Sequence, residues 1–265
     1  MTSPVRKTAT CGTRALLMLD FETTALEVAG LTVLEAAWAV CDMNGAQRSE
    51  IQQRFTAIPP QMRGGFAVTP ERPANQPAKV IVWPQRTSSA NQRALDMAVE
   101  SGLADEWIDA GKDAIIKTGD ELGRLIRDTI EQHCAPDEIV YVAGAGVARF
   151  DYSILESRCS AAHHRVHYRA VDTSVACTTL CGENTSEEIR AAYLKKGGPS
   201  LVLVAGSPYF QMNRTHGQAQ EWVRGNADPH RAAADVARAI ITQRALWELV
   251  GGPMRKLLSM ESEPS

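Results

Sequence analysis

The chain has 265 residues, of which 44% are hydrophobic, and its 28 Lys and Arg against 31 Asp and Glu give a net charge of −3. This composition excludes wholesale disorder, collagen and coiled-coil arrays, and the near-neutral charge excludes a polycation that holds nucleic acid by bulk attraction. No uncharged stretch has the ~20 mostly apolar residues of a membrane span. The six cysteines form no CxxC pair, so we expect reduced thiols in a cytoplasmic protein.

The first sixty residues predict a meander of three strands. The apolar run 15–20 (ALLMLD) is typical of a buried central strand. Two further strands are predicted over 32–41 and 50–57, and an Asn-Gly turn at 44–45 indicates that the third strand returns antiparallel to the second. Prolines and glycines between 58 and 90 exclude a long helix, so we expect an insertion there.

The rest of the chain predicts alternating helices and strands. Apolar spacing predicts helices over 91–102, 118–134, 150–159, 174–181 and 229–250. Short apolar runs predict strands over 138–143 and 166–172, and the irregular stretch 182–228 is expected to be a second insertion. Together these elements predict a single α/β domain over 14–250 with a mixed sheet flanked by helices, between flexible ends at 1–13 and 251–265.

Two acidic residues end the first predicted strand. Asp20 and Glu22 are two residues apart, so on a strand both carboxylates would project from the same face ~6.5–7 Å apart. Acids held together in this way repel unless a cation bridges them, and hard divalent metals are bound by such oxygen clusters. The pair therefore favours a metal site, although a solvated loop after the strand explains it equally well.

Two further acids and a histidine lie where helices are predicted to begin. Asp151 begins the helix after the fourth strand, and His230 and Asp235 lie at the start of the last helix. Asp235 stands among alanines, whose small side chains let a helix approach a sheet closely. Taken singly, each residue also has an ordinary explanation, as a helix cap or as a surface acid paired with Arg231 or Arg238.

In combination, these residues resemble the three motifs of the DEDDh 3′–5′ exonucleases. LDFETT at 19–24 is similar to the first motif, RFDYSILE at 149–156 to the second and HRAAAD at 230–235 to the third, and the resemblance covers roughly 14–250. A sister branch of the family has a tyrosine four residues before the last aspartate, where this chain has Arg231. The histidine branch is therefore favoured.

The resemblance implies an RNase H-like fold and a two-metal mechanism that releases nucleoside 5′-monophosphates from the 3′ end of single-stranded or short RNA or DNA oligonucleotides. His230 would be the general base. All-oxygen ligands favour Mg²⁺ or Mn²⁺, two ions in all. The ligands implied for these ions are Asp20, Glu22, Asp151 and Asp235.

Within that family, HYRAVDTS at 167–174 is similar to the oligoribonuclease branch. By this resemblance, Arg169 and two hydroxyl side chains hold the terminal phosphate of a short substrate. The implied substrate-binding residues are Thr23, Leu26, Arg169, Ser174 and Thr178. We expect an oligonucleotide as partner, allow for a homodimer, and expect no membrane partner.

Three other interpretations stay open. Gly144 and Gly146 follow a strand and Asp172 ends the next one, as in dinucleotide-binding folds, but Arg149 stands where that motif has its third glycine. A non-catalytic nucleic-acid-binding member of the RNase H-like fold is a second alternative. Cysteines and histidines within 159–181 are zinc-type ligands, but their spacing lacks the paired halves of zinc modules.

Overall fold

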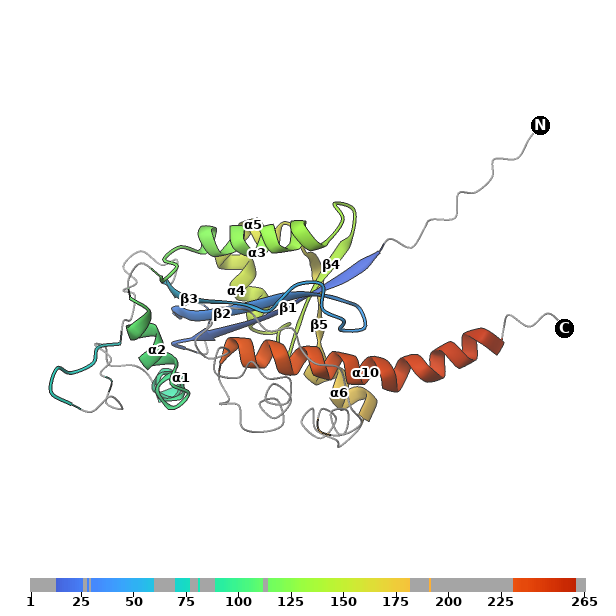
Figure 1. Cartoon of the computed structure of the whole chain (residues 1–265). Coiled ribbons are helices and arrows are strands. Elements are labelled where there is room, and N and C mark those ends of the chain that lie inside the picture. Colours follow the sequence, from blue (N-terminus) through green and yellow to red (C-terminus); the bar gives the residue numbers. More distant parts are fainter. Residues whose placement is uncertain are drawn as a thin grey trace.

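Five strands form one mixed sheet in the computed structural model (Figure 1), which describes residues 13–25, 28, 30–59, 70–76, 81, 89–111, 114–181, 191 and 231–260. The strands are β1 (Arg14–Thr23), β2 (Val33–Asp42), β3 (Gln52–Ile58), β4 (Ile139–Gly144) and β5 (His167–Asp172). Their order is β3-β2-β1-β4-β5; β1 to β3 are antiparallel, while β4 pairs in parallel with β1 and β5. This confirms the expected α/β domain, in which an antiparallel meander is extended by parallel strands.

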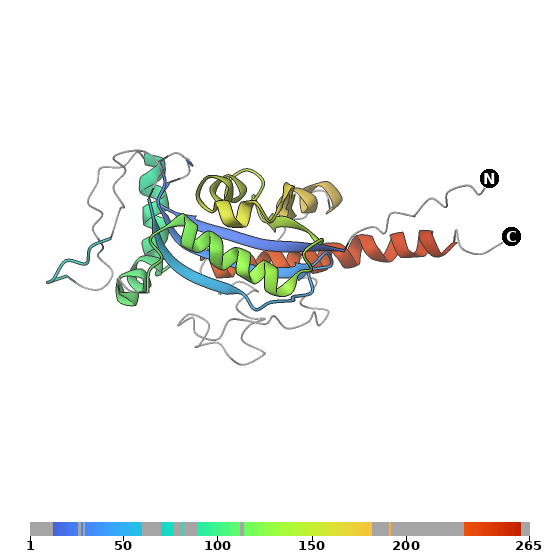
Figure 2. The ribbon, with the colours of Figure 1, turned by 90° about the horizontal axis from the view of Figure 1, so that it is seen from above.

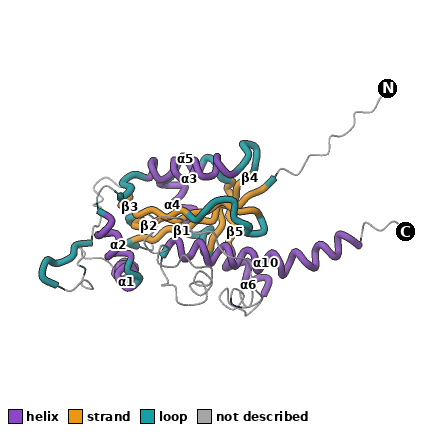
Figure 3. Tube along the Cα trace, in the orientation of Figure 1, coloured by secondary structure: helices purple, strands orange, loops and turns teal. Residues whose placement is uncertain are grey.

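Helices cover both faces of this sheet, as Figures 1 and 3 show. One face carries α3 (Gly119–His133), α4 (Asp151–Arg158) and the short α5 (Ser160–His163). The other face carries α6 (Thr173–Cys181) and the long α10 (Ala232–Met260). Two more helices, α1 (Ser89–Glu100) and α2 (Leu103–Ala110), lie at the end of the sheet where β1 ends, which the view from above also shows (Figure 2).

Strand periodicity divides the core into two layers. Leu16 and Met18 of β1 pack with the alanine-rich start of α10, whereas Leu17 and Leu19 pack on the opposite face with α3 and α4. Successive residues of a strand point to opposite faces, so Asp20 and then Glu22 continue the series that faces α10. The alternation of β1 by itself therefore directs both carboxylates toward that helix.

The structure corrects two expected boundaries. The last helix continues to Met260 rather than ending near Val250, although Gly251, Gly252 and Pro253 are typical of a helix end. A proline inside a helix removes one hydrogen bond and crowds the carbonyl four residues earlier, which can kink the helix without ending it. The helix expected over 91–102 ends at Glu100, and Gly102, with φ of 72°, caps the N-terminus of α2. This eight-residue helix was not predicted, because it is too short for apolar spacing to identify a helix.

Other expectations fall mostly outside the described residues. They are the insertions at 58–90 and 182–228 and the N-terminus at 1–13, which stay predictions. Among the described helices, none combines the length and the apolar character that crossing a membrane requires.

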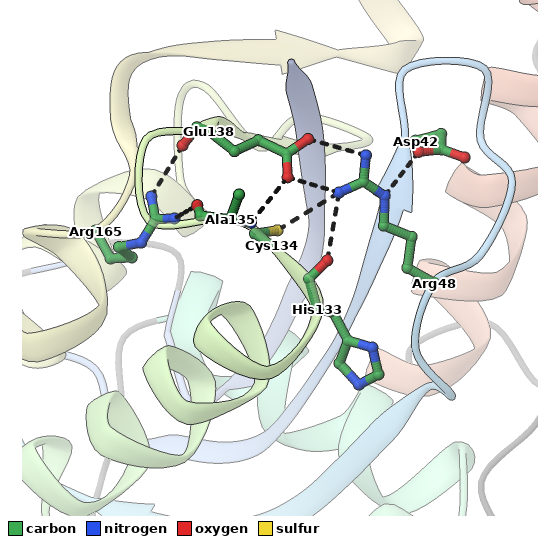
Figure 4. Close-up of polar contacts among 7 residues, drawn as sticks. All are labelled: Asp42, Arg48, His133, Cys134, Ala135, Glu138 and Arg165. Atoms are coloured by element: carbon green, nitrogen blue, oxygen red, sulfur yellow. Dashed lines mark hydrogen bonds and ion pairs between the residues drawn. The ribbon is translucent and has the colours of Figure 1, made fainter. Parts of the chain in front are cut away.

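A cluster of ion pairs joins three segments at the end of the sheet where β1 begins (Figure 4). Arg48, which follows β2, donates to both carboxylate oxygens of Glu138 at 2.8 and 2.9 Å and to Asp42 at 2.7 Å. Asp42 pairs with Ala15 in the register of β1 and β2. This Arg48 cluster thus lies about 17 Å along β1 from Asp20.

Candidate active site

Three carboxylates from two elements meet where β1 ends. One oxygen each of Asp20, Glu22 and Asp235 lies within 4.8 Å of the other two, and all three residues are partly buried. β1 supplies the first two and the first turn of α10 supplies the third. In the part of the chain that the structure describes, no other group of three His, Cys, Asp or Glu side chains gathers in this way, including the histidines and cysteines described within 159–181.

Asp151, the first residue of α4, lies beside this group. Its Oδ1 accepts the backbone N–H of Phe21 at 3.0 Å, and Phe21 stands between Asp20 and Glu22 in β1. The Asp151 residue is only 4% exposed. Burial raises the pKa of the Asp151 carboxyl to about 7. The structure therefore brings together the four acids that the sequence singled out, three as one group and Asp151 next to them.

The acids oppose one another's ionisation. Burial, followed by repulsion from Asp151 and Asp235, raises the pKa of Asp20 well above its usual value. For Glu22 burial is again the first cause of a raised pKa, and the charges of Asp235 and Glu35 follow. A bound cation would favour the ionised forms and reverse these shifts, so the electrostatics of the site fit a metal ion held by carboxylate oxygens.

The chain turns directly after Glu22. The register of β1 and β2 becomes irregular between Glu22 and Thr23, and such bulges re-aim side chains next to active sites. The Thr23 hydroxyl donates to the carbonyl of Ala25 at 2.8 Å. Backbone and side-chain hydrogen bonds between Thr24 and Thr32 then close the turn. Of the two predicted substrate-binding residues here, Thr23 is thus buried within the turn, and Leu26 lies outside the described residues.

Small side chains bring α10 to the sheet. The predicted alanine stretch around Asp235 is fully buried, as 0% exposure of Ala232, Ala233, Ala234 and Ala237 shows. Asp235 also forms an ion pair with Arg238 on the same helix. Arg238 is one of the two arginines that the sequence suggests as a partner for Asp235. His230, the proposed base, precedes the described part of this segment.

The glycines after β4 have structural explanations. A Cβ on Gly144 would lie 2.7 Å from the carbonyl oxygen of Leu19, so only glycine lets β4 end this close to β1. Gly146 has a φ of 73° and donates its N–H to Asp172 at 3.1 Å. Asp172 Oδ1 also accepts from the backbone and hydroxyl of Ser174 and from the N–H of Val175. This accounts for both glycines and for Asp172 without a bound dinucleotide.

The predicted phosphate-binding residues lie on β5 and α6. The Ser174 hydroxyl donates to Asp172 at 2.6 Å, and the Thr178 hydroxyl donates to the backbone of its own helix at 3.1 Å. Arg169 is exposed, and its guanidinium carbon lies 5.4 Å from the centre of the Tyr168 ring. It lies where the register between β4 and β5 is irregular. Their common role in phosphate binding stays a prediction.

One buried acid of this region, Glu35, was not among the predicted site residues. Glu35 of β2 is 0% exposed and is paired in register with Glu22, so both side chains lie on the same face of the sheet. The sequence does indicate this residue, because Glu35 is an acid within the apolar run 32–41, just as Asp20 and Glu22 are acids at the end of an apolar strand.

Comparisons with known proteins give structural neighbours only. No protein-family profile matches the chain, and no curated protein matches it in sequence. Three solved structures of exonuclease I are similar: one that addresses how its processivity is achieved (12% identity, TM-score 0.46), the zinc-bound E. coli enzyme with single-stranded DNA (13%, 0.43), and the E. coli enzyme with a 5cy-dT13 oligonucleotide (13%, 0.45).

These similarities cover 93% of this chain but only 43% of exonuclease I, so the chain spans less than half the length of these neighbours. At this identity, and with TM-scores below 0.5, they carry no argument about activity.

Proposed function

We propose that the chain is a metal-dependent 3′–5′ exonuclease that hydrolyses phosphodiester bonds at the 3′ end of single-stranded or short oligonucleotides and releases nucleoside 5′-monophosphates. The observation that carries this proposal is the gathering of Asp20, Glu22 and Asp235 within 4.8 Å, with buried Asp151 bonded to the strand between the first two. A protein gains no stability from acids that repel one another in a partly dry site, so their clustering favours a role in binding cations.

The four acids fit divalent ions. Together they carry up to four negative charges, which two divalent cations would neutralise, and oxygen ligands favour Mg²⁺ or Mn²⁺. Two such ions, when bound, would supply charge for the scissile phosphate and activate the attacking water. Asp20, Glu22, Asp151 and Asp235 would hold them, and the backbone N–H of Phe21 orients Asp151 for that purpose.

The remaining steps belong to side chains around the acids. His230, next in the chain to Arg231, would accept the proton of the attacking water, since an imidazole with an ordinary pKa of ~6.5 is mostly neutral at pH 7. Arg169, Ser174 and Thr178 would bind the terminal phosphate of a short substrate, as in the oligoribonuclease branch. The homodimer and the cytoplasmic location stay predictions.

Product analysis tests the proposal. RNA and DNA oligonucleotides of two to twenty residues, labelled at the 5′ end, are incubated with the protein in Mg²⁺, in Mn²⁺ and in EDTA. We expect a ladder that shortens from the 3′ end, with nucleoside 5′-monophosphates as products, and no reaction in EDTA. Asp20→Asn should be inactive. Glu138→Gln, which changes a buried acid of the Arg48 cluster, should retain the activity.

Internal cleavage, shortening from the 5′ end, or full activity in EDTA would each refute the proposed function. Activity of Asp20→Asn above a tenth of the wild-type value would remove Asp20 from the metal ligands.

A further inference from the structure

Arg231 is a fully buried arginine between two acids from different elements. It is 0% exposed and lies just before α10. Its Nε and Nη2 lie 3.3 and 3.1 Å from the carboxylate oxygens of Glu35 in β2. Its Nη1 and Nη2 donate to the two oxygens of Glu106 in α2, at 2.9 and 2.8 Å. One guanidinium thus joins the sheet, α2 and the beginning of α10.

Glu35 would otherwise be a fifth acid of the metal site. It is directly opposite Glu22 in the register of β1 and β2, and like charges at such positions repel. The carboxylate of Glu35 is occupied elsewhere, because it accepts from Arg231, from the side-chain amide of Gln53 and, at 2.9 Å, from the backbone N–H of Ala232. Glu35 therefore faces α10 as an anchor rather than joining the three gathered acids.

These contacts hold the turn of α10 that carries Asp235. The N–H of Ala232, the first residue of the helix, is bonded to Glu35, and the N–H of Asp235 donates to the carbonyl of Arg231 at 3.0 Å. Without a cation, the negative charges of Asp20 and Glu22 would repel that of Asp235. The ion pairs of Arg231 oppose a displacement of Asp235, because moving the start of α10 would expose or unpair buried charges.

We propose that Glu35, Arg231 and Glu106 form a positioning cluster, which holds the start of α10 so that Asp235 stays in the metal site before the metal binds, and which thereby sets the metal affinity. This inference rests on the proposed function, because it assumes that the acids bind divalent ions. None of the three residues is itself a metal ligand. Through Glu106, the helix α2 helps to hold the start of α10, although α2 was not predicted from the sequence.

Mn²⁺ affinity of the folded protein tests the cluster. Isothermal titration with Mn²⁺ is run on the wild type, on Arg231→Met, on Glu106→Gln and on the double variant, with hydrolysis followed in parallel. Residues that orient metal ligands typically change metal affinity about 10- to 100-fold, and we expect a rise of this size in the Mn²⁺ dissociation constant of Arg231→Met. Because the Glu106 side chain is partly exposed, Glu106→Gln should raise the constant about two- to fivefold.

The double variant separates positioning from general destabilisation. If Glu106 acts only through Arg231, adding Glu106→Gln to Arg231→Met should not raise the dissociation constant further. Arg48→Met is the matched control, since Arg48 also binds a buried glutamate with two hydrogen bonds, but at the far end of β1 (Figure 4). It should lower the unfolding temperature and leave the Mn²⁺ dissociation constant unchanged.

Several outcomes overturn the inference. A Mn²⁺ affinity of Arg231→Met equal to or tighter than that of the wild type would show that Arg231 does not position the site, as would an equal loss of affinity in Arg48→Met. If Arg231→Met does not fold, unchanged affinity in Glu106→Gln overturns the inference by itself. A wild type that neither binds Mn²⁺ nor hydrolyses oligonucleotides would instead refute the proposed function.

Discussion

Replacing Asp151 by asparagine should stabilise the metal-free protein while abolishing hydrolysis. The buried carboxyl has a pKa of about 7 against an ordinary 3.8, a difference of about three units. At 1.36 kcal/mol per unit, keeping this group ionised in the folded state costs at most about 4 kcal/mol. Asparagine carries no charge, and its side-chain oxygen can still accept the N–H of Phe21.

The size of this stabilisation depends on pH between the unfolded and the folded pKa of Asp151. Below pH ~4 the carboxyl is protonated in both the folded and the unfolded chain, so it contributes no difference. Between pH ~4 and ~7 the folded chain binds more protons than the unfolded one, and stability falls as the pH rises. The advantage of Asp151→Asn over the wild type should therefore be near zero at pH 4, grow up to pH 7 and stay constant at pH 8.

Urea unfolding in EDTA at pH 4, 6 and 8 measures this difference. Asp172→Asn is the contrasting variant, because its burial is outweighed by hydrogen bonds from Ser174, Val175 and Gly146, which lower the pKa of Asp172. The contribution of Asp172 is present above its unfolded pKa and lost at low pH, so Asp172→Asn should destabilise the protein at pH 8. If Asp151→Asn is less stable than the wild type at pH 8, burial does not disfavour the ionised form of Asp151 in the metal-free site, and the reasoning is wrong.

Three further predictions concern metal and substrate. Mn²⁺ at a hundred times its dissociation constant should stabilise the wild type by about 2.7 kcal/mol in urea unfolding, and this gain should shrink strongly in Asp20→Asn. His230→Ala should lower the hydrolysis rate ~10²–10⁴-fold and leave the Mn²⁺ affinity measured by titration nearly unchanged. Asp235→Ala should lower both the rate and the Mn²⁺ affinity. If His230→Ala loses as much Mn²⁺ affinity as Asp235→Ala, then His230 is a metal ligand. Arg169→Ala should slow the turnover of substrates of two to four nucleotides roughly ten- to a hundredfold, and should slow the turnover of longer substrates less. If turnover falls equally for substrates of all lengths, Arg169 has a structural role instead.

Much of the fold could be predicted from local patterns. The apolar run of β1, the Asn-Gly turn after β2 and the spacing of α3 each report on neighbours in the sequence, and the structure confirms these elements to within a few residues. That Asp20 and Glu22 share one face of the sheet could also be predicted locally, because side chains two residues apart on a strand point to the same side. The predicted end of α10 was wrong, because one proline does not always end a helix. The helix α2 was not predicted, because eight residues are too few for apolar spacing to identify a helix.

Only the tertiary structure decided how the acids are held. Asp151 acquires its pKa of about 7 from burial against β1, 130 residues away in the sequence. Arg231 meets Glu106 and Glu35 across 125 and 196 residues. Read locally, Arg231 is an ordinary helix-end charge, and Glu35 is an isolated acid in an apolar strand. Whether such a charge is solvated, paired or available to a metal depends on which distant groups exclude water from it, and sequence periodicity carries no record of those groups.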